Sequence, residues 1–344
     1  MKKQKLLVIV LIVFSVSLIS FAFYAYQAVE TPNVLVDQPD KVVLIPDGAD
    51  FKQVQNLLYD EGYVHDLISF STLAKLMKYD ENVKPGRYLL RSEMNNLEAI
   101  RLLRSGNQTP VDITFNNIRL KHELAERLCE NLQADAATFE AMLNDEEVVK
   151  EYGFTTENVL TMFIPDTYQF FWTTSERELL DRMHREYEKF WTAERRQLAD
   201  SLQMSPTEVS ILASIVESET NKADEAPMVA GLYLNRLQRN IALQADPTLV
   251  FAAQDFTIKR VLNKHKEIDS PYNTYRYTGL PPGPIRIPSP NSLKAVLDHK
   301  DHNYLYMCAK EDFSGYHNFA TNLRTHLANA QRYQRALSKA GIYN

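Results

Sequence analysis

Cysteine is scarce in this chain: two, Cys129 and Cys308, stand among 344 residues. They lie far apart in the sequence and form no metal-ligand pattern, so we expect neither a metal site nor a bound cofactor. Outside the cytoplasm they could form a disulfide. Both stand in apolar surroundings, however, where buried free thiols are an equally good interpretation. The sequence leaves these two states open.

Basic clusters are lacking as well, apart from the lysines among the first five residues. The formal net charge is −6, and such a chain lacks the electrostatic footprint of a nucleic-acid-binding protein. A hydrophobic content of 45% is enough for globular domains with cores. The chain beyond residue 27 has room for two or three of them.

The N-terminal segment lacks a small-x-small cleavage site. Its lysines precede an uncharged apolar run over residues 6–26, which as a helix would span roughly 32 Å, enough for the hydrocarbon core of a membrane. Aromatic side chains at the end of the run are typical of a membrane interface, and no nearby cysteine offers a lipid anchor. We therefore predict that residues 1–27 form a single-pass signal anchor with the lysines in the cytoplasm. The alternative is a cleaved signal peptide, whose apolar region is usually shorter.

The next part of the chain predicts a linker and a small module. Residues 28–40 contain two prolines and are typical of a short extended linker. Apolar periodicities then predict a strand, two helices, a second strand and a third helix. In order, these elements are expected over residues 42–46, 51–61, 67–77, 87–90 and 97–103. The order β-α-α-β-α makes residues 41–106 a compact α+β module.

The rest of the chain also predicts α+β structure. A strand is expected over residues 111–115, and helices over residues 120–131, 135–143, 176–199, 205–220 and 226–239. Beyond residue 239 we expect a loop-rich chain, and the prolines of residues 269–290 exclude regular structure there. A long ordered loop of this kind in a compact domain is usually functional.

The helix expected over residues 205–220 carries the strongest chemical signal. Ser205 as N-cap and Glu208 as its capping-box partner define the start of the helix. An almost wholly apolar run follows and ends in two carboxylates, Glu217 and Glu219. Burial beside such a run would raise the pKa of a carboxyl and keep it protonated near neutral pH, as a general acid requires. The alternative is that both glutamates simply solvate the end of the helix.

Six motifs occur in one order from residue 163 onward. They are FIPDTY at residues 163–168, LASIVESET at 212–220, LQADPT at 243–248, SPYNTY at 270–275, GLPPGPI at 279–285 and GYHNF at 315–319. With them the chain resembles, from about residue 40 onward, the MltG/YceG family of endolytic murein transglycosylases. The resemblance implies that residues 41–106 are a LysM-like module and that residues 111–344, with a core over 160–320, are the catalytic domain. One departure is at Leu160 and Thr161, where family members commonly have Glu-Gly.

The resemblance implies a lyase of the bacterial cell wall. Such an enzyme cleaves the β-1,4 bond between N-acetylmuramic acid and N-acetylglucosamine in nascent peptidoglycan, leaves 1,6-anhydro ends and terminates strand elongation. Glu217 would be its acid and base. The chain would be anchored in the cytoplasmic membrane with its catalytic domain outside, and peptidoglycan synthases are further candidate partners. Two alternatives are a non-catalytic peptidoglycan-binding scaffold and a muramidase-type hydrolase with Asp246 as second carboxylate.

The motifs also supply candidate substrate-binding residues. Asp246 could orient a sugar or stabilise positive charge, but before Pro247 it could equally be an Asx turn or a helix cap. Amide, hydroxyl and tyrosine side chains suit sugars, although each also has common structural roles. The candidates are Glu219, Gln244, Asp246, Tyr272, Asn273, Thr274, Tyr275, Pro282, Gly283 and His317.

Overall fold

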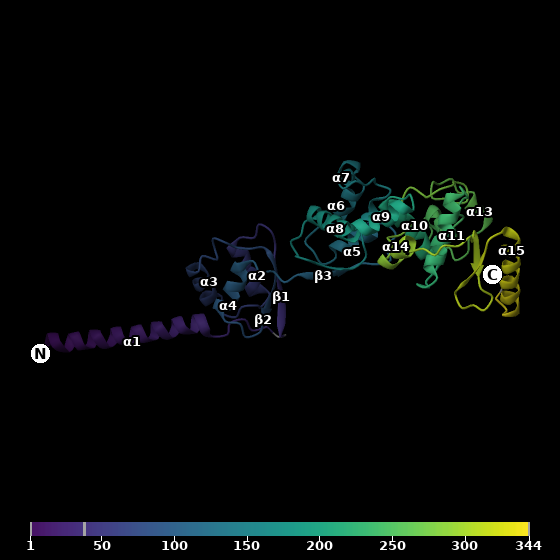
Figure 1. Cartoon of the computed structure of the whole chain (residues 1–344). Coiled ribbons are helices and arrows are strands. Elements are labelled where there is room, and N and C mark those ends of the chain that lie inside the picture. Colours follow the sequence, from purple (N-terminus) through teal and green to yellow (C-terminus); the bar gives the residue numbers. More distant parts are fainter. Residues whose placement is uncertain (1, 37–38, 343–344) are drawn as a thin grey trace. The chain divides into compact units, whose positions relative to one another are not determined.

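The computed structural model describes residues 2–36 and 39–342 (Figure 1). The chain divides into two compact units. The first takes the chain up to residue 112 together with the short segments 131–133 and 169–175, and the second holds the remainder. Helices and strands occur in both units, which confirms the predicted α+β class.

The first helix is α1 (Lys2–Glu30). Its stretch Gln4–Glu30 is long and apolar enough to cross a membrane. Large apolar side chains along it are exposed, from Leu6 at 63% to Phe21 at 70%. Water does not favour a helix that is apolar all round. The helix predicted over the apolar run is therefore present, with a surface suited to lipid.

The small module has the predicted order of elements. They are β1 (Asp40–Ile45), α2 (Phe51–Asp60), α3 (Leu67–Leu76), β2 (Gly86–Arg91) and α4 (Asn96–Ser105). The two strands pair antiparallel, with Val43 opposite Tyr88, and both side chains are buried. Capping boxes at Asp50 and Asn95 start α2 and α4. Local signals of this kind explain why the module was predictable.

The segment directly after α1, expected as a short extended linker, packs into this module through Asn33 and Val34. Val34 is fully buried, and the backbone N–H groups of Asn33 and Val34 both donate to the carbonyl oxygen of Met94 at 3.0 Å. The Asn33 side chain donates to Asn96 Oδ1 at 2.7 Å. Asn96 Nδ2 in turn donates to the carbonyl oxygen of Ala28 at 2.8 Å. The chain therefore passes from α1 directly into the packed module.

The second unit is mostly helical. Its elements include α5 (Lys121–Cys129), α6 (Ala136–Leu143), α7 (Glu146–Glu151), the 3-10 helix η1 (Val159–Met162), α8 (Glu176–Phe190), α9 (Ala193–Ser201), α10 (Pro206–Glu219), α11 (Ala226–Gln238), α12 (Asp246–Ala253), α13 (Asn263–Lys266), α14 (Pro290–Leu297) and α15 (Leu323–Lys339). Two antiparallel strands, β5 (Tyr306–Ala309) and β6 (His317–Ala320), lie between α14 and α15 in the chain. A further ribbon pairs β3 (Val111–Thr114) with β4 (Thr167–Phe170), and the boundary between the two units falls within both of these strands. Within this unit α10 is central, because every residue from 209 to 216 is buried and the helix contacts α9, α11, α12, α14 and η1.

Two predictions about this unit were wrong in extent. Residues 176–199 do not form one helix but two, α8 and α9. The break occurs where Trp191, only 2% exposed, enters the core and Thr192 caps α9 by accepting the N–H of Arg195. Beyond residue 239 the chain also has more regular structure than expected, including α14, α15 and the β5–β6 pair. Residues 269–289 contain no helix or strand, as predicted, but Pro290, the last residue of the range predicted to be irregular, begins α14.

Candidate active site

Helix α10 delivers two carboxylates to the surface of the second unit. Its predicted start is confirmed, since Ser205 and Glu208 form a capping box. The helix stays buried up to Val216, and Glu217 and Glu219 follow at its C-terminal end. That end carries a partial negative charge, so carboxylates there need other groups to stabilise them. The two side chains find different partners.

The carboxyl of Glu217 is held by the loop of residues 269–289, called the proline-rich loop below. Its Oε2 accepts the backbone N–H of Ser289 at 2.6 Å, and its Oε1 lies 3.4 Å from Nη2 of Arg286. The side chain is 20% exposed. The same loop is attached to α10 deeper in the core, where Ser214 Oγ accepts the backbone N–H of Ile285 at 3.1 Å. Glu217 thus has one cationic and one backbone partner and remains open to solvent.

Glu217 faces a cleft of about 590 Å³. Charged side chains on the walls of this cleft come from the start of α5, the end of α10, the start of α12, the loop after α12 and the proline-rich loop. They are Arg119, Glu217, Glu219, Asp246, Lys259, Arg260 and Arg286. Apolar surface is supplied chiefly by Val250, Phe251, Phe256 and Ile258. The cleft therefore combines a carboxyl, several cations and apolar walls of a kind on which a sugar could rest.

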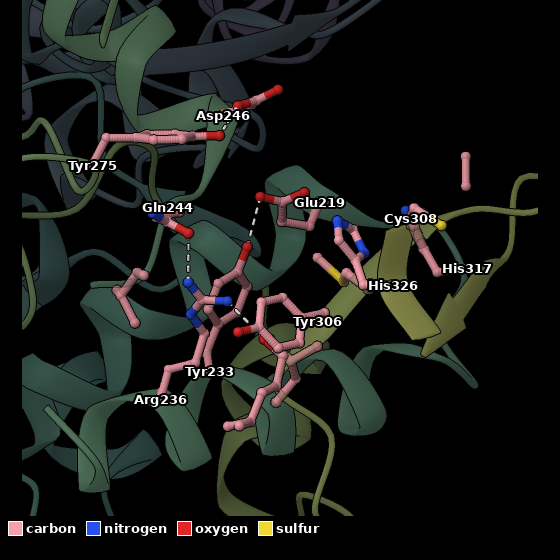
Figure 2. Close-up of a pocket in the computed structure, with 15 residues that line it drawn as sticks. Glu219, Tyr233, Arg236, Gln244, Asp246, Tyr275, Tyr306, Cys308, His317 and His326 are labelled. Atoms are coloured by element: carbon pink, nitrogen blue, oxygen red, sulfur yellow. Dashed lines mark hydrogen bonds between the residues drawn. The ribbon is translucent and has the colours of Figure 1, made fainter. Parts of the chain in front are cut away.

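Glu219 borders this cleft and a second cavity of about 320 Å³ (Figure 2). The hydroxyl of Tyr233 donates to Glu219 Oε1 at 2.7 Å. Burial raises the pKa of Glu219 to about 7, against the effect of the Tyr233 hydrogen bond, and the charge of Asp246 adds to the rise. A carboxyl that titrates near neutral pH was expected from the sequence for this helix end. The structure places it at Glu219.

Asp246 also borders both cavities. It stands in the first turn of α12, whose N-cap is Ala245 and not Asp246. Instead, Asp246 Oδ1 accepts the hydroxyl of Tyr275 at 2.5 Å. Figure 2 shows Glu219 between the Tyr275–Asp246 pair and the strands that carry Cys308 and His317. Two carboxylates thus separate the larger cleft from the second cavity.

Comparison with known proteins identifies the family. Residues 43–332 match the model of the YceG-like family. The chain belongs to the YceG-like family. A YceG-like protein from Listeria monocytogenes, solved by crystallography, superposes with a TM-score of 0.56 at 26% identity, covering 84% of this chain and 98% of that one.

Two curated relatives carry the name endolytic murein transglycosylase. The Streptococcus pneumoniae protein is 26% identical over 339 residues, which cover 89% of this chain and 61% of the relative. The Bacillus subtilis protein is 38% identical over 136 residues, covering 38% of this chain and 37% of the relative. The chain therefore spans about three fifths of the length of the first relative.

In this YceG-like protein, Gln244 and His317 line the second cavity with their side chains tied down. Gln244 Oε1 accepts from Arg236 Nη2 at 2.8 Å, while Arg236 Nη1 donates to the backbone oxygen of Leu305 at 2.6 Å. His317 Nδ1 lies 2.8 Å from Glu225 Oε2, and its backbone N–H donates to Glu225 Oε1 at 2.7 Å. Both side chains are therefore fixed before any ligand enters.

Asn273 and Thr274 are buried behind the site. Asn273 Nδ2 donates to the backbone oxygens of Lys266 and Ile268, at 3.0 and 2.7 Å. Thr274 Oγ1 accepts the backbone N–H of Ala245 at 3.1 Å. These contacts fix the loop before Tyr275 and the turn before Asp246. Both side chains therefore position the site rather than line its cavities.

Tyr272, Pro282 and Gly283 lie away from the cleft of Glu217. Tyr272 packs against Phe251 with ring centroids 4.7 Å apart and faces a neighbouring cavity that also contains Leu160. Pro282 lines another cavity beside the start of α10. Gly283 approaches a backbone so closely that a Cβ would lie 2.0 Å from the carbonyl oxygen of Glu157. Its role is steric.

Several residues of the site escaped the sequence analysis. Arg286 and Ser289 hold Glu217, Tyr233 holds Glu219, and Arg236 holds Gln244. The signal for Arg286 was its place directly after the GLPPGPI motif. Cys129 and Cys308 are both free thiols. Across residues 2–36 and 39–342, no group of three or more His, Cys, Asp and Glu side chains is arranged to hold a metal ion.

Proposed function

We propose that this chain is an endolytic lytic transglycosylase of nascent peptidoglycan. It would cleave the β-1,4 bond between N-acetylmuramic acid and N-acetylglucosamine, leave a 1,6-anhydro end and thereby terminate strand elongation. The observation that carries the proposal is Glu217, a partly exposed carboxyl fixed by Ser289 and Arg286 in a cleft of about 590 Å³. Membership of the YceG-like family and the names of the relatives support it.

The proposed reaction needs one carboxyl in two roles. Glu217 in its acid form donates its proton to the glycosidic oxygen as the bond to C1 of muramic acid breaks, and positive charge develops at C1. The Glu217 carboxylate so formed has the Ser289 N–H and Arg286 as partners. It then takes the proton of the C6 hydroxyl, whose oxygen attacks C1. The ring closes, Glu217 is protonated again, and no water is consumed.

The surrounding candidates take supporting roles in this proposal. Glu219 and Asp246, which lie between the two cavities, would stabilise the positive charge at C1. Gln244, Tyr275 and His317 would bind a neighbouring sugar in the second cavity. Asn273, Thr274 and Gly283 shape the loops from behind, and we assign Tyr272 and Pro282 to sugars farther along the strand. These assignments follow from which cavity each side chain faces.

The remaining parts of the chain suit an enzyme that works near a membrane. We propose that α1 is a single-pass anchor in the bacterial cytoplasmic membrane and that everything after it lies outside the cytoplasm. The β-α-α-β-α module would be the LysM-like domain and would bind glycan. Such a tether restricts the catalytic domain to strands close to the bilayer, where a peptidoglycan synthase would be a neighbour.

A hydrolase of the muramidase type is the second candidate. It is favoured by Asp246, because that carboxylate borders the same cleft as Glu217 and could activate water. A third candidate, a peptidoglycan-binding scaffold, would need no fixed carboxyl in a cleft. The mass of the products separates the first two, since hydrolysis adds one water and ring closure adds none.

The test is digestion of purified peptidoglycan by the wild type and by Glu217→Gln, with the products analysed by mass spectrometry. Glu126→Gln is the matched control, because Glu126 is an exposed glutamate on α5 outside both cavities. We expect anhydro-ended muropeptides from the wild type and the control and, because general acid catalysis is lost, at least about a hundredfold less from Glu217→Gln. Hydrated ends would identify the muramidase, and undiminished activity of Glu217→Gln would refute the assignment.

A further inference from the structure

The cleft of Glu217 has a basic wall, and of its cations the proposed reaction uses only Arg286. Arg119, Lys259, Arg260 and Arg286 line it. A neutral sugar does not require four cations. Arg286 is accounted for in part, since it lies 3.4 Å from Glu217. Arg119 needs another explanation.

The guanidinium of Arg119 is not neutralised by the protein. It lies over the ring of Phe256, with Cζ 4.9 Å from the centroid. Over the ranges 2–36 and 39–342, no carboxylate or other acceptor forms an ion pair or hydrogen bond with it, although its backbone N–H donates to Glu123 Oε2 at 2.8 Å. The arginine is thus placed by an aromatic ring at the cleft wall with its donors available.

Arg286 is close enough to feel this charge. Burial lowers the pKa of the Arg286 guanidinium; Glu217 opposes this, and the positive charge of Arg119 lowers the pKa further. Arg286 Nη2 donates to Asn117 Oδ1, whereas Arg286 Nε is buried and has no partner within the described part of the chain. Two guanidiniums that repel each other at a cleft wall cost free energy unless an anion joins them. The unpaired guanidinium of Arg119 in the cleft wall, beside the charge of Arg286, therefore indicates a negatively charged ligand.

We propose that Arg119 and Arg286 form a receptor for a carboxylate of the substrate, carried by the peptide attached to muramic acid. This inference rests on the proposed function, which places muramic acid C1 beside Glu217. The peptide hangs from the same sugar, so its carboxylates are within the neighbourhood of the cleft. Guanidinium groups bind carboxylates through two parallel hydrogen bonds. Phosphate offers the same oxyanion chemistry, but the pyrophosphate of a lipid-linked strand lies at the strand end, far from an internal bond.

The receptor makes the enzyme selective for glycan that still bears charged peptides. Charge-assisted hydrogen bonds of this kind change binding by roughly tenfold or more. Because the carboxylate is remote from the breaking bond, its recognition affects substrate binding and the transition state alike. The effect therefore belongs to KM rather than to kcat.

The test uses soluble, uncrosslinked glycan strands with peptides, and the same strands after their carboxylates have been converted to amides with carbodiimide and ammonia. The full chain is compared with Arg119→Met, which keeps an unbranched stem over Phe256. Arg335→Met on α15 is the control, because Arg335 is an exposed arginine outside the cleft. We expect amidation to raise the wild-type KM roughly tenfold. Arg119→Met should have this higher KM on both the untreated and the amidated strands. Arg335→Met should give the same two KM values as the wild type.

Three outcomes would contradict the receptor. The first is that the wild type cleaves both substrates with the same KM. The second is that Arg119→Met raises KM by the same factor on untreated and on amidated strands. A third series uses amidated strands with and without their lipid pyrophosphate, and a preference for pyrophosphate would show that the receptor binds phosphate instead of carboxylate. Absence of cleavage of any strand by the wild type would count against the proposed function, not against the receptor alone.

Discussion

Glu217 and Glu219 stand two residues apart on one helix, yet the protein treats them differently. Glu217 has a cation and a backbone N–H as partners and faces the larger cleft. Glu219 has a tyrosine hydroxyl and a more buried setting, and its pKa is raised to about 7. Unlike surroundings for two carboxyls are the usual way in which a site separates their roles. Here they suit Glu217 to contact with the substrate and Glu219 to support of the site.

The raised pKa of Glu219 makes the stability of the second unit depend on pH. Because the pKa rises from an ordinary 4.5 to about 7, the folded protein holds this proton more tightly than the unfolded chain. The contribution to the free energy of unfolding is therefore full below about pH 4.5 and is lost as pH rises through 7. Glu219→Gln, neutral at every pH, should stabilise the unit at pH 8 by about 3 kcal/mol at most and change little at pH 4.5. Chemical denaturation at both pH values measures this, with Glu126→Gln as control; equal effects at both would contradict it.

At the scale of elements, the proline-rich loop of residues 269–289 is what assembles the site. It supplies Tyr275 to Asp246, Arg286 and Ser289 to Glu217, and it is fastened to α10 through Ser214. A loop without helix or strand keeps its shape through such side-chain contacts. The geometry of Glu217 therefore depends on contacts buried beneath it.

Ser214→Ala tests that dependence. The substitution leaves the buried N–H of Ile285 without its acceptor, which costs about 1–3 kcal/mol. Ser210→Ala is a matched control, because the Ser210 hydroxyl is equally buried on α10 and donates only to its own helix, at Pro206. We expect faster amide exchange in residues 283–289 and a lower kcat for Ser214→Ala than for Ser210→Ala. Identical exchange and kcat in the two variants would show that the Ser214 contact does not hold the loop.

What could be predicted from the sequence depends on how far apart the interacting residues lie along the chain. The start of α10 and the β-α-α-β-α order were predictable because caps and periodicity lie within a few residues. The break at Thr192 was missed because the charged pattern continues across it, and only the burial of Trp191 creates it. The partners of Glu217 were missed because Arg286 and Ser289 lie about seventy residues away, a separation that no local pattern spans. The motifs predict where the site is, and the hydrogen bonds show how its side chains are held.

At the scale of the molecule, three parts follow one another along the chain: an apolar helix, a small α+β module and a larger unit with the cleft. The three parts differ in where their apolar side chains lie. The apolar helix exposes hydrophobic side chains that suit a lipid phase better than water, whereas the other two parts bury most of theirs. This order along the chain is the one that the proposed membrane-anchored enzyme requires.

Removal of residues 2–26 should therefore move the protein from the membrane fraction to the soluble fraction. Ala28 and its hydrogen bond to Asn96 are kept, so the module should remain folded and cleavage of isolated strands should be comparable to that of the full chain. Fractionation and intact mass provide the measurement. A truncated protein that stays with membranes would contradict the anchor. If the protein expressed with residues 1–27 is recovered without its apolar run, the run is a cleaved signal peptide.

The way α1 joins the module sets how far that anchor lets the protein reach. A flexible linker of about ten residues would allow excursions of roughly 17 Å. In this protein, Asn33 and Val34 are hydrogen-bonded to Met94, Asn33 also donates to Asn96, and Val34 is buried. Little of the chain between α1 and the module is therefore free to extend. If α1 spans a bilayer, the module would lie next to the lipid headgroups and not at the end of a flexible linker. Under the proposed function, the first glycan that the module would meet is the strand that has just emerged.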